Sequence, residues 1–453
     1  MEYWKRAGRV LAVFCLANFL LVFTVVAPLS GWPAAGVLLG LLAFYLYFNL
    51  RPRRAKGATR RLRALLGGYE LLLVCFFVIL AETVFCPALA LSGALDGLAY
   101  SGAVWMPLLV NALVFVPVVG LLLVNGFFRV LITCKRLRVV WRVLLLLCWW
   151  VPLFNLYLFF RVLKAARSEY YFERARLESE AVHAENGDCK TRYPLVLVHG
   201  IFFRDWQLIG YWGRIPQALQ KCGAEIYYGG QQSAAPVAAS AAELKAHILE
   251  ILERTGAEKV NLIAHSKGGL DSRCAISRLG LADKVASLTT INTPHRGCVF
   301  AEHLLQSLPP KLLGQMERKY NAVFHKLGDD KPDFMGGVRD LAADACRAFN
   351  EQTPDAEGVL YQSVMSTMKS PKSAGFPLNL TWRLVNKYDK QENDGLVARA
   401  SAPWGRFLGE VTVPGRRGIS HGDIIDLLRE DIDGFNVREF YIDLVRDLKQ
   451  QGL

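Results

Sequence analysis

Long apolar runs dominate the first third of this chain and constrain its fold more than any other feature. Each run is close to the ~20 residues that an α-helix needs to cross a lipid bilayer. The runs cover residues 11–29, 34–50, 65–91, 103–128 and 143–160. The first run is long, lacks a small-residue cleavage site and is followed at once by another, so we expect a retained helix rather than a signal peptide. Residues 1–165 are therefore predicted to form a transmembrane helical region of four to five helices.

The net charge of +13 originates in the same region. Residues 1–165 hold 17 Lys and Arg against 4 Asp and Glu, whereas residues 166–453 hold 36 of each. The basic residues stand between apolar runs instead of covering a folded polar surface. This distribution indicates a multi-pass membrane protein and argues against nucleic-acid binding.

The loops between the runs indicate an orientation. Residues 51–63 carry seven basic side chains and residues 129–142 carry five, whereas the two alternate loops carry none. By the positive-inside rule, the N-terminus and both basic loops lie in the cytoplasm. The fifth run contains Pro152 and is followed by five basic residues in 161–176. We expect it to form a kinked, re-entrant or interfacial helix, and we favour the cytoplasmic face for the C-terminal part of the chain.

Glu82 lies deep in the third run, where a charged group costs about 2.5–3.5 kcal/mol. It could mark an ion path. We favour the alternative, a protonated or neighbour-bonded Glu that helps the helices pack, because no relay partner is evident in the sequence.

The second part of the chain has a different pattern. Residues 166–192 mix both charges and are predicted to form a helical linker. From 193 to 453, apolar stretches such as "YPLVLVHG", "KVNLIAHS" and "KVASLTTINTP" alternate with amphipathic ones such as "AAELKAHILEILERTG". This alternation predicts an α/β domain with a mostly parallel central sheet and helices on both faces.

The cysteines of this part number five, at 189, 222, 274, 298 and 346. An odd number without regular spacing predicts free thiols rather than a disulfide framework or a metal site. Free thiols are typical of a reducing compartment.

The stretch "NLIAHSKGGLD" reads as a strand, a sharp turn and a helix start, with Ser266 at the turn. This is the pattern of a nucleophile elbow, in which the residues two before and two after the serine must be small. Ala264 replaces the usual glycine on one side at the cost of one methyl group, and Gly268 keeps the other side open. An ordinary turn capped by Ser266 is the alternative interpretation.

The stretch "LVLVHGIFFRD" predicts a strand that ends at Val198, followed by a turn. Such a turn can direct a backbone N–H at a reacting carbonyl oxygen. The N–H of Ile201 or Phe202 would be one donor of this oxyanion hole, and that of Lys267 the other. His199 is expected to hold the loop.

An acid and a base follow later in the chain. Asp394 lies in a polar turn between "TWRLVNKY", which we expect to be a strand, and "LV", and His421 lies in a Gly-flanked loop. The order Ser266, Asp394, His421 is the one that α/β-hydrolases use. In that arrangement His421 takes the proton of Ser266, and Asp394 orients the imidazole. Asp389 is a weaker candidate for the acid.

The other histidines are expected to have structural roles. His295 in "NTPHRG" should hold a loop near the site rather than act as the base. For His295, His303 and His325 a packing or solvated role is favoured.

Residues from about Tyr193 to Asp443 resemble bacterial lipases of the α/β-hydrolase fold. The resemblance rests on "LVLVHG", "LIAHSKGGLDSR", "SLTTINTPHRG", "NDGLV" and "ISHGDIID", in the family's order. It implies an α/β-hydrolase fold with Ser266, Asp394 and His421 as triad. Departures from the family are Ala264, Lys267 after the serine, and the membrane-spanning N-terminus. Many such lipases hold calcium near the histidine loop, where Asp423 resembles one ligand. No clear matching aspartate lies upstream of Asp394, so no cofactor or metal is predicted, and calcium is the alternative.

An insertion at about 299–358 separates the "TPHRG" stretch from the acid strand. Its first part is amphipathic and helical, with a break at Pro309–Pro310. We interpret it as a helical cap over an acyl pocket; plain packing on the sheet is the alternative.

These features predict a membrane-anchored serine hydrolase that cleaves carboxylic esters of lipids. An acyltransferase or thioesterase with the same triad is one alternative. A membrane scaffold or transport protein with an inactive hydrolase-like domain is another. The expected partners are a lipid or other ester and the bilayer. No sequence pattern indicates an acyl-chain length or an oligomeric state.

Overall fold

The computed structural model describes all residues except 1, 27, 54–56, 97–104, 149, 202–209, 233, 308, 327–328 and 330. The chain forms two compact units, Met1–Leu177 and Glu178–Leu453. Each is described by itself below.

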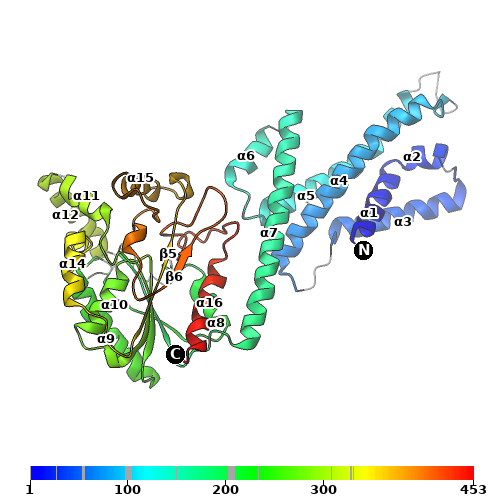
Figure 1. Cartoon of the computed structure of the whole chain (residues 1–453). Coiled ribbons are helices and arrows are strands. Elements are labelled where there is room, and N and C mark those ends of the chain that lie inside the picture. Colours follow the sequence, from blue (N-terminus) through cyan, green and yellow to red (C-terminus); the bar gives the residue numbers. More distant parts are fainter. Residues whose placement is uncertain are drawn as a thin grey trace. The chain divides into compact units, whose positions relative to one another are not determined.

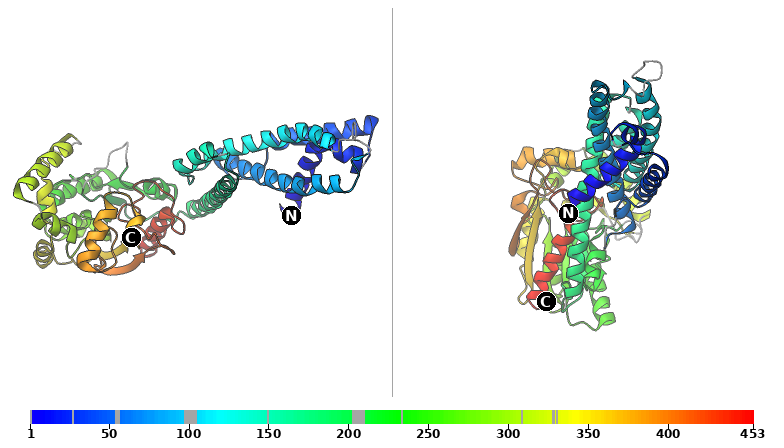
Figure 2. Two further views of the ribbon diagram at one scale, coloured as in Figure 1. Left: turned by 90° about the horizontal axis from the view of Figure 1, so that it is seen from above. Right: turned by 90° about the vertical axis from the view of Figure 1, so that its right-hand side faces the viewer.

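The first unit is helical (Figure 1). Its elements are α1 (Glu2–Ala17), α2 (Phe19–Leu21), a π-helical turn (Val22–Val26), α3 (Gly31–Leu50), α4 (Arg60–Leu91), α5 (Trp105–Thr133), α6 (Val139–Leu147) and most of α7 (Pro152–Asn186). Helices α4 and α5 run side by side (Figure 2). They come closest at two glycines, because a Cβ on Gly68 would lie 2.9 Å from the Gly126 carbonyl oxygen. Small residues at such a crossing let two apolar helices pack without a hydrophobic driving force between them.

Three helices, α3, α4 and α5, are long and apolar enough to cross a membrane, and a bent pair formed by α1 and residues Phe19–Val26 would make a fourth. The prediction of one continuous helix over residues 11–29 is wrong, because the two parts of the pair meet at 85°. The break lies at Asn18, whose side-chain amide donates to the Phe14 carbonyl at 3.2 Å. A side chain that bonds the backbone of the preceding turn competes with the helical ladder and bends it.

The fifth apolar run is also interrupted, as Pro152 predicts. Helix α6 ends at Leu147 and α7 begins at Pro152. Neither is among the described helices that are long and apolar enough to span a membrane.

The two glutamates of α4 have different partners. Glu82 accepts hydrogen bonds from the Asn18 amide at 2.7 Å and from the Cys86 thiol at 2.9 Å. The structure thus favours the neighbour-bonded interpretation of this residue. Glu70 is completely buried and lies 2.7 Å from Arg6, 3.2 Å from Arg9 and 2.5 Å from Arg53.

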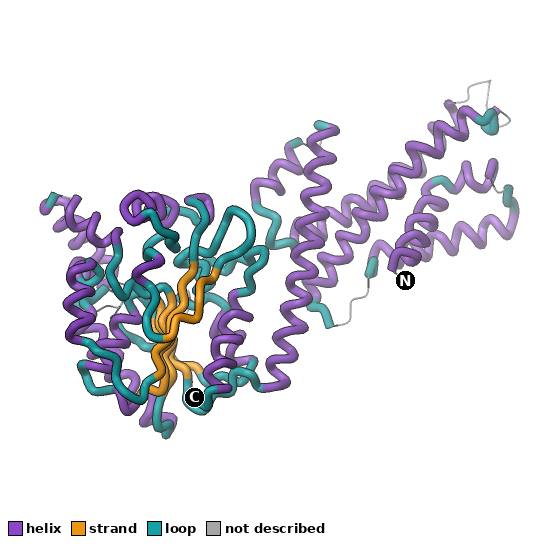
Figure 3. The backbone as a smooth tube through the Cα atoms, viewed as in Figure 1, coloured by secondary structure: helices purple, strands orange, loops and turns teal. Residues whose placement is uncertain are grey.

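The second unit contains the sheet and its covering helices (Figure 3). Its strands are β1 (Leu195–Val198), β2 (Ile226–Tyr228), β3 (Val260–His265), β4 (Val285–Ile291), β5 (Leu360–Ser366) and β6 (Arg406–Val411). Its α-helices after α7 are α8 (Ile215–Lys221), α9 (Val237–Thr255), α10 (Gly268–Ser277), α11 (Val299–Ser307), α12 (Pro310–Lys326), α13 (Phe334–Arg339), α14 (Ala343–Gln352), α15 (Leu378–Asp389) and α16 (Val437–Gln450).

The six described strands are all parallel, in the order β2-β1-β3-β4-β5-β6. Every residue of β1, β3 and β4 is buried, as expected for a parallel sheet covered on both faces. Alternate residues serve two cores. Val196 and Leu262 pack with α9 and α10, whereas Leu197 and Ile263 pack with α8 and α16. The predicted α/β class with a mostly parallel sheet is confirmed.

The strand expected over residues 381–388 is wrong, because these residues belong to α15. Thr381 and Val385 are the buried side chains of that helix. They stand four residues apart, which puts both on one helical face.

The last turns of α7 belong to the second unit. The His183 ring lies 2.5 Å from Asp188 Oδ2 and 2.8 Å from Glu439 Oε1 on α16. The Ser179 hydroxyl donates to the same Glu439 carboxylate at 2.9 Å. These contacts hold the start of the second unit on its final helix.

The contrast between Glu70 and Glu82 predicts different tolerance to loss of charge. Replacing Glu70 by Gln leaves three arginines beside a neutral amide, and breaking a buried ion pair in this way costs about 3–5 kcal/mol. Glu82→Gln keeps a hydrogen-bonding partner for Asn18 and Cys86 and should cost about 1 kcal/mol or less. Thermal unfolding of the full chain in detergent measures both. Equal shifts for the two variants would contradict this account.

Candidate active site

The sharp turn after β3 has the geometry of a nucleophile elbow. Strand β3 ends at His265, Ser266 has φ 55°, and α10 begins at Gly268. A non-glycine residue in the left-handed region costs about 1–3 kcal/mol and persists only where surrounding structure imposes it. Here the Ser266 N–H donates to the Ile291 carbonyl of β4 at 2.9 Å. The register of the two central strands therefore holds the serine in this conformation.

Close packing around the turn explains the small residues. A Cβ on Gly268 would collide with the His199 carbonyl oxygen, and one on Gly200 would lie 2.7 Å from the Ser266 Cβ. Ala264 is fully buried in β3 and its methyl group is accommodated. The glycine that is usual at position 264 is thus not required by this backbone.

The predicted acid and base are in direct contact. Nδ1 of His421 lies 2.6 Å from Oδ2 of Asp394. Asp394 is fully buried, and its other oxygen accepts the N–H groups of Leu396 at 2.9 Å and Val397 at 2.8 Å. The His421 N–H also donates to the Asp394 carbonyl at 2.8 Å. An ionised carboxylate suits these donors, and it holds the imidazole with its Nδ1 protonated.

The His421 ring also lies next to the elbow. Its centroid is 4.4 Å from that of His265, the residue before Ser266. Asp394 follows β5 and α15 in the chain, and His421 follows β6. All three predicted residues thus come from loops after strands of one parallel sheet, where sites of α/β folds form. Asp389, the weaker candidate for the acid, ends α15 and is half-buried.

A hydrogen-bonded chain supports the turn after β1, and sequence reasoning missed its central residue. The Tyr211 hydroxyl accepts the Gly200 N–H at 3.0 Å and lies 2.6 Å from Nδ1 of His265. Burial and the neighbouring His421 hold the pKa of His265 well below its usual range. A neutral His265 can accept a hydrogen bond from the Tyr211 hydroxyl, so the elbow and the His199–Gly200 turn are both bonded to one tyrosine. No pattern in the sequence singles out Tyr211.

His199 has the structural role that was expected. Its ring nitrogens lie 2.8 Å from the Gly200 carbonyl and 3.0 Å from the Gln231 carbonyl. Of the predicted oxyanion-hole donors, Ile201 follows this turn directly and lines a pocket together with Ser266. Phe202 lies outside the described residues. Lys267 follows Ser266 at the N-terminus of α10.

The Lys267 side chain forms a buried ion pair. Its Nζ lies 2.7 Å from Oδ1 of Asp271 and donates to the Ser240 hydroxyl of α9 at 2.9 Å. Lys267 and Asp271 are 1% and 2% exposed. Burial raises the pKa of Asp271 to about 6 even with Lys267 beside it. The ammonium group is thereby committed to holding α10 against α9.

The three remaining histidines that the sequence analysis named have packing or surface positions. His295 is fully buried, stacks on Trp404 and lies 3.1 Å from the Thr290 hydroxyl. Burial and the adjacent Arg273 hold its pKa well below the usual range, which fits a packing role. His303 pairs with the Tyr388 ring, and His325 is exposed on α12.

Asp423, the residue that resembles a calcium ligand of such lipases, has partners within the protein. Its carboxylate accepts the Ser420 N–H at 3.0 Å and pairs with Arg417 at 3.2 Å. Within the described residues, no group of three His, Cys, Asp or Glu side chains is arranged to hold a metal. Asp423 instead braces the loop that carries His421.

A small apolar pocket adjoins Ser266. It is lined by Ile201, Leu396 and Val397, and by Phe300 and Ala301 from α11. Its volume is about 30 Å³, room for about two water molecules. A fatty-acyl chain would therefore require α11 or its neighbours to move.

The fold agrees with that of a known family over part of the chain. Residues 193–399 match the model described as alpha/beta hydrolase fold. The second unit is an α/β-hydrolase domain. Within it the elbow, the acid–base pair and the turn after β1 occupy the positions at which this fold carries its chemistry.

Three known proteins illustrate the likeness. A triacylglycerol lipase of Burkholderia plantarii is 35% identical over 190 residues, which cover 39% of this chain and 52% of the relative. A triacylglycerol lipase of Pseudomonas fragi is 28% identical over 296 residues, covering 58% of this chain and 98% of the relative. A crystal structure of a lipase from Bacillus licheniformis has 22% identity and a TM-score of 0.42, covering 56% of this chain and 91% of that one. The chain thus spans about half the length of the first relative.

The buried ion pair beside the elbow predicts that the effects of two substitutions on the unfolding free energy do not add. Asp271→Asn leaves Lys267 buried without a counter-charge and should cost about 3–5 kcal/mol of unfolding free energy. The double variant Lys267→Met/Asp271→Leu replaces both charges with apolar groups of similar size and should recover most of that loss. Denaturant unfolding followed by tryptophan fluorescence compares the two. A double variant less stable than Asp271→Asn would show that the pair stabilises the domain by its charge.

Proposed function

We propose that this protein is a membrane-anchored serine hydrolase that cleaves carboxylic esters of lipids. The observation that carries the proposal is the 2.6 Å contact between His421 Nδ1 and Asp394, with the His421 ring beside the strained elbow of Ser266. The similarity to triacylglycerol lipases supports an ester as substrate.

The chemistry follows from the roles of the three side chains. Nε2 of His421 takes the Ser266 proton as the hydroxyl oxygen attacks the ester carbonyl carbon. The tetrahedral oxyanion is stabilised by backbone N–H groups after Gly200 and at Lys267, each worth about 3–4 kcal/mol. His421 then gives the proton to the leaving alcohol, and an acyl-enzyme remains on Ser266. Water activated by His421 releases the acid and restores the serine.

Asp394 keeps His421 in the productive tautomer. Because its carboxylate is buried and receives two backbone N–H groups, it stays fixed while the imidazole changes charge. It stabilises the imidazolium without taking the proton.

The substrate class is inferred from the pocket. Its lining is apolar, which suits an acyl chain rather than a polar group. Helix α12, in the cap insertion, exposes Leu312, Tyr320 and Val323. Exposed apolar side chains on an amphipathic helix can contact a lipid surface as the cap moves.

The proposed location of the hydrolase domain is the cytoplasmic side of the membrane. The basic loop at 51–63 favours the cytoplasmic side. Helices α4 and α5 are each long and apolar enough to cross once, which would return the chain to that side. This holds whether the bent pair at α1 crosses or re-enters. Helices α6 and α7 are not candidate spans among the described helices, so the chain stays on that side.

Loss of the nucleophile provides the first test. Ser266→Ala should abolish both ester hydrolysis and covalent labelling by a fluorophosphonate, because the attacking oxygen is removed. Ser277→Ala, at the end of the helix that follows Ser266 and with its hydroxyl bonded to the Pro354 carbonyl, is the matched control and should retain both. A folded wild-type protein that is not labelled would instead favour a scaffold with an inactive domain. Product analysis with added alcohol separates hydrolysis from acyl transfer.

The two aspartates offer a second test. Asp394→Asn should lower kcat by about 10⁴-fold, because the amide favours the wrong imidazole tautomer. Asp389→Asn should leave kcat unchanged, since no described contact joins Asp389 to His421. Hydrolysis of a soluble p-nitrophenyl ester measures both. Equal activity of Asp394→Asn and wild type would remove Asp394 from the mechanism.

Sidedness is tested in intact cells. A membrane-permeant fluorophosphonate should label Ser266, whereas an impermeant one should do so only after lysis. Labelling of intact cells by the impermeant probe would reverse the topology and leave the chemistry untouched.

A further inference from the structure

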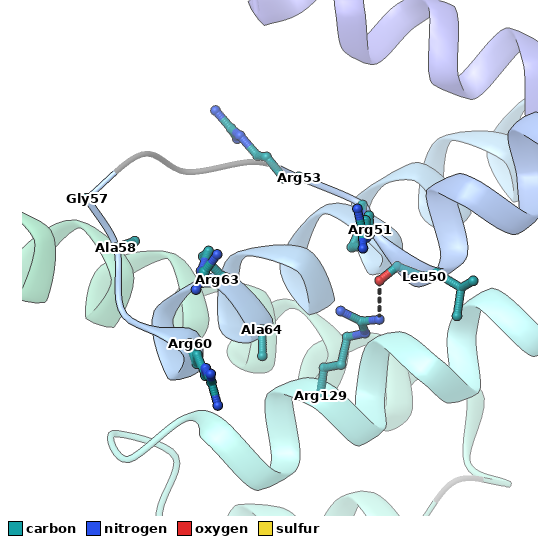
Figure 4. Close-up of a pocket in the computed structure, with 10 residues that line it drawn as sticks. Leu50, Arg51, Arg53, Gly57, Ala58, Arg60, Arg63, Ala64 and Arg129 are labelled. Atoms are coloured by element: carbon teal, nitrogen blue, oxygen red, sulfur yellow. Dashed lines mark hydrogen bonds between the residues drawn. The ribbon is translucent and has the colours of Figure 1, made fainter.

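A large cavity in the first unit lies far from the chemistry of Ser266 in the sequence and is rich in arginine. It lies where α3 ends and α4 begins, and has a volume of about 840 Å³. Five arginines line it: Arg51, Arg53, Arg60, Arg63 and Arg129 (Figure 4). None of the described residues that line it is acidic. We call it the arginine pocket.

The positive charge of this pocket is only partly balanced. Arg53 pairs with Glu70, but Glu70 is shared with Arg6 and Arg9, so one carboxylate faces three guanidinium groups. Within the part of the chain that the structure describes, Arg51, Arg60 and Arg63 form no ion pair with a carboxylate. All three are exposed.

Arg129 reaches the pocket from the neighbouring helix α5. Its guanidinium donates to the carbonyl oxygens of Asn49 and Leu50 at 3.1 Å each, and its Nε donates to Asn125 at 2.9 Å. These acceptors are neutral, so they orient the group without cancelling its charge. Figure 4 shows the Arg129 side chain directed at the end of α3, with Arg60 and Arg63 on α4.

The backbone adds to the same potential. Helix α4 begins at Arg60 and is 32 residues long, with no acidic residue in its first turn. Helix N-termini carry partial positive charge and normally attract acids. A cluster of arginines there raises the local potential further, and an anion would lower it.

The size and surroundings of the pocket indicate the kind of anion. Guanidinium groups match the oxygens of phosphate in bidentate geometry. A free phosphate ion would fill only a small part of 840 Å³. Leu50, which lines the pocket, is 73% exposed, and Phe128, next to Arg129, is 63% exposed. The pocket thus places guanidinium groups beside exposed apolar side chains at the ends of membrane-length helices. This arrangement suits a molecule with a charged head and apolar tails.

We propose that the arginine pocket binds the phosphate of an anionic phospholipid headgroup. The phosphate contacts Arg51, Arg60 and Arg63, and the acyl chains lie along the apolar ends of α3 and α5. This site is independent of the proposed hydrolase chemistry, since all of its residues belong to the first unit.

The test uses the full chain in nanodiscs of phosphatidylcholine, with phosphatidylglycerol or phosphatidic acid added. Retained lipid is counted by native mass spectrometry after release into detergent. Wild-type protein should retain an anionic lipid. The triple variant Arg51→Gln/Arg60→Gln/Arg63→Gln should bind it at least tenfold more weakly.

A matched control removes the same charge elsewhere in the first unit. Lys135→Gln/Arg138→Gln/Lys164→Gln changes three exposed basic residues that do not line the pocket, and it should retain the lipid as wild type does. Equal loss in both triple variants would mean attraction to surface charge alone and would overturn the proposal.

A charge-preserving variant covers the case in which the glutamine variant does not fold. Arg51→Lys/Arg60→Lys/Arg63→Lys keeps the net charge but loses the bidentate geometry, so it should bind several-fold more weakly. Unchanged binding would overturn specific phosphate recognition. Inorganic phosphate provides the last arm: if it binds at millimolar concentration while no lipid is retained, the ligand is a soluble phosphate and the lipid assignment fails.

Discussion

The left-handed backbone conformation of Ser266 depends on the close packing of β1, β3 and β4. The rest of the second unit is arranged around these central strands. The serine N–H is held by Ile291 of β4, and the turn after β1 comes so close that Gly200 and Gly268 cannot carry a side chain. Strain of about 1–3 kcal/mol persists there because every residue of β3 and β4 is buried between two cores. The conformation of Ser266 thus depends on the buried sheet as well as on the hydrogen bonds of the turn itself.

In both units buried charged side chains contact groups of the opposite charge, but the ratio of cations to anions differs. Lys267 and Asp271 form a one-to-one pair, so their burial leaves no net charge beside Ser266. Glu70 is surrounded by three arginines, and its surroundings keep a positive excess. A neutral pair suits the proposed mechanism, in which aligned backbone dipoles would stabilise an oxyanion for which a mobile ammonium group would compete. An excess of cations suits a region that meets anions from outside.

Part of this structure follows from the sequence because it depends on periodicity and on local turns. The alternation of apolar strands and amphipathic helices predicted the parallel sheet, and "AHSKGG" predicted the turn at Ser266. Long-range partners were less accessible. Tyr211 contacts both Gly200 and His265, the second of which lies 54 residues further along the chain, and no local pattern marks it. The stretch "TWRLVNKY" was expected to be a strand but belongs to the helix Leu378–Asp389, in which Thr381 and Val385 lie on one face. Asn18 was unremarkable in an apolar run, yet its bonds to Phe14 and Glu82 coincide with the bend of the first helix pair.

The basic residues of the first unit are more clustered than the positive-inside rule requires. Positive-inside bias requires only that charge lie on one side of the bilayer, and lysine or arginine on any exposed loop would meet it. Here arginines converge from the end of α3, the first turn of α4 and the last turns of α5 on one cavity. Convergence from three elements costs mutual repulsion, which scattered charges would avoid. Arg129 shows that the arrangement is built rather than incidental, because three hydrogen bonds to Asn49, Leu50 and Asn125 fix its guanidinium at the cavity wall. A structure that holds like charges together in this way is most stable when an anion is bound among them.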